Sequence, residues 1–188
     1  MRLRVAIAGC HRMLKPQLAG HNFASAFAAV PETEIVAVYD RGPETRADFV
    51  RCWGDTPAYD DYAAMLREVQ PDLLCIATRQ TLHAAQIEAA TAAGVRGILC
   101  DKPLATSLLE ADRILATCRE HGVALTFALD RRWHSSYRQL RQWIADGIVG
   151  RVTSVLAYGS PNLLHHACSC YETALMLVGD PEPLWVSG

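Results

Sequence analysis

A polar turn directly after a buried strand is the first place in this chain where chemistry could be done. Residues 98–100 are apolar or nearly so, and Asp101 and Lys102 follow at once, before a proline that has no N–H to donate to a sheet. In an open parallel sheet, ligands bind outside the carboxyl ends of the strands. The spacing therefore makes Lys102 a candidate for chemistry, and the alternative is a solvated lysine in a surface turn.

A second candidate site lies near the N-terminus. An apolar strand leads into Gly9, and the next strand ends in Asp40, an order that is typical of dinucleotide binding. Asp40 could accept both ribose hydroxyl protons, and its charge would repel a ribose phosphate. This favours NAD over NADP, although the neighbouring Arg41 could reverse the preference.

The glycine fingerprint of that site is incomplete. The stretch from Gly9 to Leu14 keeps the first glycine of G-x-G-x-x-G but has His11 at the second position and Leu14 at the third. A side chain at His11 restricts the approach of phosphate to the backbone, and Arg12 or Lys15 could offset this by pairing with phosphate. Dinucleotide binding and a purely structural turn both stay open. The candidate cofactor residues of this stretch are Gly9, Cys10, His11 and Arg12.

The elements that would position these residues alternate between strand and helix. Short apolar runs predict strands, and amphipathic or alanine-rich segments between them predict helices. Such alternation indicates parallel strands joined by right-handed crossovers. We predict an α/β fold with a doubly wound parallel sheet of the Rossmann type, with strands over 3–9, 34–40, 72–78, 97–100 and 123–129.

The regular alternation of strand and helix patterns ends after residue 129. We predict a dinucleotide-binding domain over 1–129 and the incomplete start of a second, α+β domain over 130–188. Residues 151–158 alternate with a period of two, which predicts a strand, and residues 184–188 read as the beginning of another. Because such a remnant leaves sheet edges unpaired, either another chain completes it or the sequence is part of a longer protein.

Composition excludes several classes of partner. The chain has 188 residues, is 51% hydrophobic and 20% charged, and carries a formal net charge of -2. Without a basic stripe or a long apolar run, we expect neither a nucleic-acid nor a membrane partner. The 7 cysteines include several inside apolar runs, where they read as small buried hydrophobes in a reducing compartment. A cytoplasmic location is therefore expected.

Several motifs in order resemble one family. These are the run from Arg4 to Asp40, the stretch from Ala77 to His83, the stretch from Cys100 to Ala105, and the passage from Arg131 to Val152. Together they resemble the Gfo/Idh/MocA oxidoreductases (glucose–fructose oxidoreductase and inositol dehydrogenase), which carry T-P-N-x-x-H after the fourth strand and E-K-P after the fifth. The resemblance implies an NAD(P)-dependent oxidoreductase that acts on a sugar, a cyclitol or a related polyol.

The resemblance also implies roles for single residues. Lys102 would point at the substrate hydroxyl, where its positive charge stabilises a developing alkoxide and burial would lower its pKa. The Lys102–Pro103 bond is a candidate cis peptide. Asp101 stands one methylene short of the family's glutamate near the nicotinamide ribose. The remaining cofactor contacts would be Thr78, Gln80, His83 and Pro103.

The second-domain motif of the family, D-x-x-x-H-x-x-D, is altered here. It places His165, Ser169 and Glu172 at the positions of the first acid, the histidine and the last acid. Serine cannot act as a base unaided, so His165 or His166 would have to handle the proton. Ser169 and Glu172 are candidate substrate contacts, as are Asp130 and Arg131, which could equally be solvated charges at the start of a helix.

Two other interpretations compete with an active oxidoreductase. The altered motif fits a regulatory protein that binds a dinucleotide or a sugar without turnover, or an inactive part of a longer enzyme. The run from His165 to Cys170 contains zinc-ligand types, but its spacing does not fit the usual structural sites, and we predict no metal. A homo-oligomer is expected if the second domain is complete.

Overall fold

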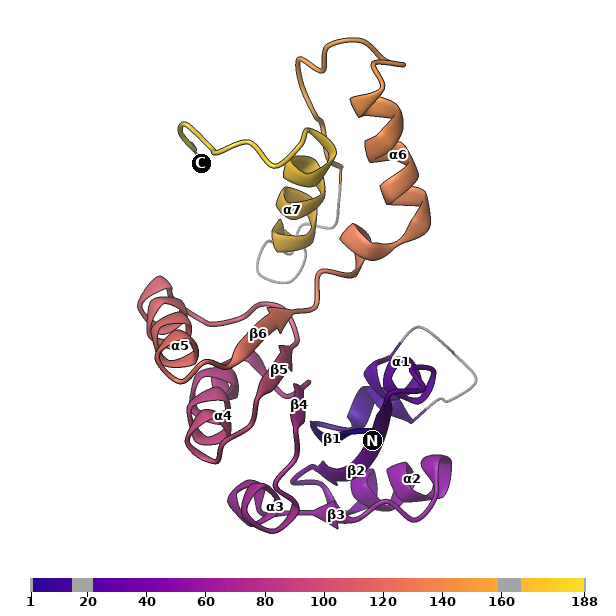
Figure 1. Cartoon of the computed structure of the whole chain (residues 1–188), viewed down its shortest axis with the longest axis vertical. Coiled ribbons are helices and arrows are strands. Elements are labelled where there is room, and N and C mark those ends of the chain that lie inside the picture. The colour runs from indigo at the N-terminus through magenta and orange to yellow at the C-terminus, as the bar shows by residue number, and fades with distance from the viewer. Residues whose placement is uncertain (1, 15–21, 159–166, 188) are drawn as a thin grey trace. The chain divides into compact units, whose positions relative to one another are not determined.

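The computed structural model describes residues 2–14, 22–158 and 167–187. The chain divides into two compact units, residues 1–128 and residues 129–188, and each is described here by itself. The first unit contains a 6-stranded sheet in the order β3-β2-β1-β4-β5-β6 (Figure 1). Its strands are β1 (Leu3–Ala8), β2 (Thr33–Tyr39), β3 (Ala58–Tyr59), β4 (Leu73–Ile76), β5 (Gly97–Cys100) and β6 (Ala124–Phe127).

All neighbouring strands run parallel, as the alternating pattern predicts. β1 lies at the centre, and its residues 5–8 are fully buried because helices cover both faces of the sheet. The two-residue strand β3 was not predicted, since two residues carry no periodicity that a sequence can show. The predicted fold class, a doubly wound parallel sheet, is confirmed.

Two helical layers enclose the sheet. Residues of η1 (His11–Met13), α1 (Phe23–Ala28) and α2 (Pro43–Trp53) pack in one apolar cluster against β1 and β2. Residues of α3 (Tyr62–Val69), α4 (Gln80–Ala92) and α5 (Leu108–Glu120) pack in the other. The strand order reverses between β1 and β4, which creates a crevice at the carboxyl ends of these two strands.

Local sequence signals set the helix boundaries. The side chains of Asn22, Asp61 and Ser107 accept hydrogen bonds from backbone N–H groups in the first turns of α1, α3 and α5. In α5, Glu110 also accepts a hydrogen bond from the N–H of Thr106, one residue before the Ser107 cap. Pro43 is the first residue of α2, where its missing N–H costs no hydrogen bond.

The second unit is helical in the described residues, with η2 (Asp130–Trp133), α6 (Ser135–Ala145) and α7 (Cys168–Leu177). Arg132, in η2, is hydrogen-bonded to residues of α7 and of the turn after it. The guanidinium donates to Oε1 of Glu172 at 2.5 Å and to both carboxylate oxygens of Asp180 at 3.0 and 2.7 Å. These hydrogen bonds, first among the causes, hold the pKa of Asp180 below its usual value. The network ties η2 to α7 and to the turn that follows it.

The predicted strands at 151–158 and 184–188 are wrong for the residues that the structure describes. Residues 152–158 and 181–187 have no regular secondary structure. Their large side chains are exposed, with 93% of Tyr158 and 94% of Leu184 accessible. An isolated strand leaves its backbone N–H and C=O groups unpaired, and neither segment has a partner strand within 2–14, 22–158 or 167–187. Alternating side chains alone do not form a strand.

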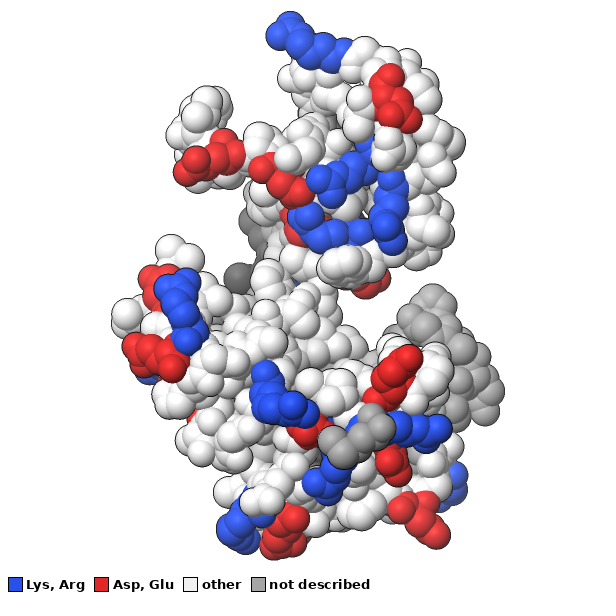
Figure 2. Space-filling model, viewed as in Figure 1, with Lys and Arg blue, Asp and Glu red and all other residues white. Residues whose placement is uncertain are grey.

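The surface of the first unit carries side chains of both charges. Figure 2 shows Lys and Arg side chains interspersed with Asp and Glu on the visible face of the first unit. Among the helices of the described segments, none combines the length and the apolar character that crossing a bilayer requires.

Gly9 lies at a close approach of two loops at the sheet's carboxyl edge. Its φ is +92°, and a Cβ built there would lie 2.7 Å from the carbonyl carbon and oxygen of Ala77 and 2.8 Å from the nitrogen of Thr78. All three atoms belong to the backbone, which cannot rotate away. The loop after β1 therefore passes the loop after β4 at a distance that only glycine permits.

We predict that Gly9→Ala lowers the free energy of unfolding by more than the matched change Gly54→Ala. Gly54 has a φ of +90° but open space around its Cβ position. Its substitution should cost about 1–3 kcal/mol from backbone strain alone, and Gly9→Ala about 1–3 kcal/mol more from the clash. Urea unfolding followed by circular dichroism measures both. Equal losses would contradict the close approach.

Candidate active site

The carboxyl ends of four neighbouring strands bring the predicted residues of the first unit to one edge. Gly9 follows β1, Asp40 follows β2, Thr78 follows β4, and Asp101 and Lys102 follow β5. Because all four strands are parallel, these residues lie on the same side of the sheet. Both candidate sites of the sequence, the one at Lys102 and the one at Asp40, are therefore parts of a single edge.

Backbone N–H groups fix the carboxylate of Asp40. Oδ2 accepts from the N–H of Cys10 and Oδ1 from the N–H of Gly42, each at 2.9 Å. Arg46 donates to the carbonyl oxygen of Asp40 at 2.6 Å. Each carboxylate oxygen keeps a further lone pair for a ligand hydroxyl. The roles of Gly42 and Arg46 were missed, although an aspartate bonded to the N–H two residues on is a common turn signal.

The other residues after β1 and β2 differ in exposure. His11 and Arg41 are exposed, whereas Cys10 is fully buried. Burial, with the nearby Asp40 charge as a lesser cause, raises the pKa of the Cys10 thiol to about 12. This thiol is therefore protonated near neutral pH and unreactive, and Cys10 contributes to the edge through its backbone N–H.

Arg12 and Asp101 form an ion pair across the crevice edge. The predicted partner of Arg12 was a phosphate, and in the structure its partner is a carboxylate on the loop after β5. Asp101 also accepts from the backbone N–H of Lys102 through Oδ1 at 2.8 Å. Lys102 itself is half-buried, and the predicted cis peptide between Lys102 and Pro103 is present.

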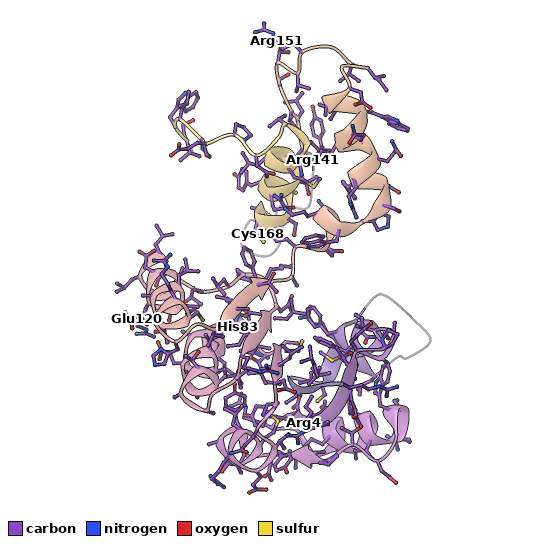
Figure 3. The ribbon with its side chains drawn as sticks, in the orientation of Figure 1. Arg4, His83, Glu120, Arg141, Arg151 and Cys168 are labelled. Carbon is purple, nitrogen blue, oxygen red and sulfur yellow. The ribbon has the colours of Figure 1, made fainter. Side chains whose placement is uncertain are left out.

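A buried imidazole joins the two loops that flank this pair. His83, on α4, has Nδ1 3.0 Å from the carbonyl oxygen of Pro103 and Nε2 3.3 Å from that of Thr78. His83 is 1% exposed. Figure 3 labels this residue in the first unit. One side chain thus holds the loop after β4 and the turn that carries Lys102 at fixed positions.

A second residue of α4 supports the same loop. The Thr78 hydroxyl donates to Oε1 of Gln86 at 2.5 Å, and the Tyr62 hydroxyl donates to the Gln86 carbonyl at 2.8 Å. Gln86 is 7% exposed, so its amide is committed to the interior. Sequence reasoning missed Gln86, and the signal that could have found it is its position three residues after His83 on the same helical face. Gln80, the first residue of α4, is half-buried.

The remaining predicted residues belong to the second unit or lie outside the described residues. His165 and His166, like Lys15, are outside them. Asp130, Arg131, Ser169 and Glu172 lie in the second unit. There Glu172 is ion-paired with Arg132, and the Arg131 guanidinium lies 6.0 Å from the centre of the Tyr137 ring. Their meeting with Lys102 at one site stays a prediction.

The run from His165 to Cys170 was weighed as a metal site. Within 2–14, 22–158 and 167–187, no group of three or more His, Cys, Asp or Glu side chains is arranged to hold a metal ion. The two histidines of the run lie outside these ranges, so the run itself is not tested. All 7 cysteines are unpaired thiols.

Comparison with known proteins identifies the family. A sequence profile described as "Oxidoreductase family, NAD-binding Rossmann fold" (GFO_IDH_MocA) matches residues 3–129. The chain belongs to the Gfo/Idh/MocA oxidoreductase family. The resemblance in the ordered motifs is thereby confirmed, and so are the Rossmann-type fold and its relation to an NAD-binding family.

Individual relatives include sugar-modifying oxidoreductases and structures solved with a nicotinamide cofactor. D-apiose dehydrogenase from Paraburkholderia graminis is 32% identical over 149 residues, which cover 79% of this chain and 38% of that protein. A 3-ketoreductase from Actinomadura kijaniata, solved with TDP-benzene and NADP, has a TM-score of 0.80 at 26% identity, covering 95% of this chain and 57% of that one.

An oxidoreductase from Agrobacterium radiobacter was solved with NAD+, L-tartaric acid and magnesium. Its TM-score is 0.71 at 27% identity, with 80% of this chain and 42% of that chain covered. The present chain thus spans 38%, 57% and 42% of these three proteins. It covers less than two thirds of each of the three.

The residues at the carboxyl edge fit a dinucleotide. Gly9 lets the loop after β1 pass directly against the loop after β4, so that both loops contribute to this edge. The fixed carboxylate of Asp40 has lone pairs for ribose hydroxyls, and Arg12 places a positive charge beside the crevice. The Asp40 carboxylate offers fixed acceptors at one end of the edge, and the Arg12 guanidinium lies near the centre. This arrangement matches a diphosphate flanked by hydroxyl-bearing sugars.

We predict that His83→Phe lowers the free energy of unfolding by about 1–3 kcal/mol, because it removes the donor to a buried carbonyl group. The matched control is His121→Phe, since His121 is exposed and contacts only the Thr117 carbonyl of its own helix. That change should stay within about 0.5 kcal/mol. Urea unfolding compares the two, and equal losses would show that His83 does not hold the loops.

Proposed function

We propose that the protein is an NAD-dependent oxidoreductase that moves a hydride between nicotinamide and a CH–OH group of a sugar, a cyclitol or a related polyol. The observation that carries this proposal is the placement of Lys102 beside Asp101 on the same sheet edge as the fixed Asp40 carboxylate. Family membership and the named relatives support the same class of reaction.

Asp40 supports NAD as the cofactor. Its carboxylate would accept the hydroxyls of the adenosine ribose, and its negative charge disfavours a phosphate at the same place. Arg41 is exposed next to it and makes NADP a possible second cofactor. The relatives solved with NAD+ and with NADP are consistent with either choice. Gly9, Cys10, His11, Arg12, Thr78, Gln80, His83, Asp101 and Pro103 complete the proposed cofactor contacts.

Lys102 would act on the substrate oxygen. The bound nicotinamide supplies the hydride acceptor. The Lys102 ammonium group would stabilise the negative charge that develops on the hydroxyl oxygen as its proton leaves. We assign that proton to His165 or His166, because Ser169 has no basic group at neutral pH.

The second unit would supply the substrate contacts. Asp130 and Arg131 would bind further hydroxyls, with Ser169 as a neutral hydrogen-bonding partner. Glu172 is held by Arg132, so its predicted substrate role would require a change of partner. In this proposal residues 1–129 bind the cofactor, and residues 130–188 belong to a domain for substrate binding and homo-oligomer formation.

The test is hydride transfer by the whole chain. Reduction of NAD+ is followed by absorbance with scyllo-inositol, D-apiose and a D-glucoside as substrates, and NADH affinity is measured by fluorescence. We expect turnover to be faster with NAD+ than with NADP+. Lys102→Met should lower kcat about 100- to 1000-fold through loss of charge stabilisation. Its NADH affinity should change little, and Lys102→Arg should recover part of the rate.

Two outcomes would contradict the proposal in different ways. Saturable NADH binding without turnover of any substrate would favour a regulatory binding protein, which the serine at position 169 already suggests. Absence of NADH binding would remove the cofactor assignment itself.

A further inference from the structure

The ion pair between Arg12 and Asp101 connects strands that are not neighbours. β4 lies between β1 and β5 in the sheet. With a strand spacing of about 4.8 Å, a contact between the loops after β1 and β5 must pass over the end of β4. The pair therefore crosses the crevice at the point where the strand order reverses, which is where a dinucleotide places its diphosphate.

The side chains of Arg12 and Asp101 differ in how far they are restrained. The side chain of Asp101 is 10% exposed, and its Oδ1 is already bound to the N–H of Lys102. The side chain of Arg12 is 63% exposed and extends from the short turn after Gly9. The carboxylate is thus the fixed partner and the guanidinium the movable one. An anion that enters the crevice meets Arg12 already bound to another anion.

We propose that Asp101 and the diphosphate of a bound nucleotide compete for Arg12. This inference rests on the proposed dinucleotide function. Arg12 contacts Asp101 through Nη2, and a diphosphate that draws on the same guanidinium charge weakens that pairing and leaves a nearly buried carboxylate less well neutralised. A ligand that carries hydroxyl donors beyond its diphosphate can satisfy that carboxylate, and a ligand that ends at the diphosphate cannot. The pair therefore selects dinucleotides over nucleoside diphosphates.

Calorimetric titration with ADP and with ADP-ribose tests the competition. Asp101→Asn removes the competing charge and keeps an acceptor for the N–H of Lys102, so ADP should bind about 5-fold more tightly or better. ADP-ribose should gain less, because it loses its partner carboxylate. Arg12→Met should weaken both ligands. In the double variant the gain for ADP should fall to less than half, since there is no arginine to release.

A matched control lies at the opposite end of the sheet. Arg96 and Asp72 form an ion pair at 2.6 Å with side chains 65% and 22% exposed, before β5 and β4 respectively. Arg96→Met and Asp72→Asn should leave both affinities unchanged. Asp101→Ser also removes the charge, and its affinities for ADP and ADP-ribose test the same expectation if the asparagine variant folds poorly.

The outcomes separate this inference from the function on which it rests. Unchanged or weaker ADP binding by the folded Asp101 variants, with ADP-ribose bound by the wild-type chain, would overturn the competition and leave the proposed function standing. Absence of ADP-ribose binding by the wild-type chain would overturn both.

Discussion

One buried imidazole carries much of the geometry of the candidate site. The His83 ring lies between the loop after β4 and the turn after β5, with Nδ1 3.0 Å from the carbonyl oxygen of Pro103 and Nε2 3.3 Å from that of Thr78. Those two loops carry Thr78, Asp101 and Lys102. A carbonyl group buried without a donor is costly, so the imidazole fixes the loops relative to each other rather than merely filling space. The position of Lys102 over the sheet edge therefore depends on a residue of α4 that does no chemistry itself.

Charge at this edge is organised in pairs. Asp40 is held by two N–H groups, and Asp101 by one N–H group and the Arg12 guanidinium. Both carboxylates are thereby oriented before any ligand arrives. Such preorganisation reduces the ordering cost of binding. In the proposed function, the Arg12 cation would offset the absence of the second and third fingerprint glycines by pairing with phosphate where the backbone cannot approach it.

The sequence predicts the first unit well because its signals are local. Apolar runs, helix caps at Asp61 and Ser107, and the acid at Asp40 each report on their own strand or helix. The pairing of Arg12 with Asp101 was not predictable, since the residues are 89 positions apart and meet only through the strand order. The strand expected at 151–158 failed for the opposite reason. Its alternation is a local signal, but a strand also needs a partner, and alternation says nothing about one.

The central claim is that a dinucleotide binds at the carboxyl edge of this sheet. Titration of the 15N-labelled chain with NAD+ tests it most directly, through changes in the amide resonances. The account predicts saturable shifts at Cys10, Gly42, Thr78 and Lys102, whose amides line that edge. It predicts unshifted resonances at Arg4 and Arg96, which lie at the amino ends of the strands. Shifts at the amino ends, or none at the carboxyl edge at saturating NAD+, would contradict the claim.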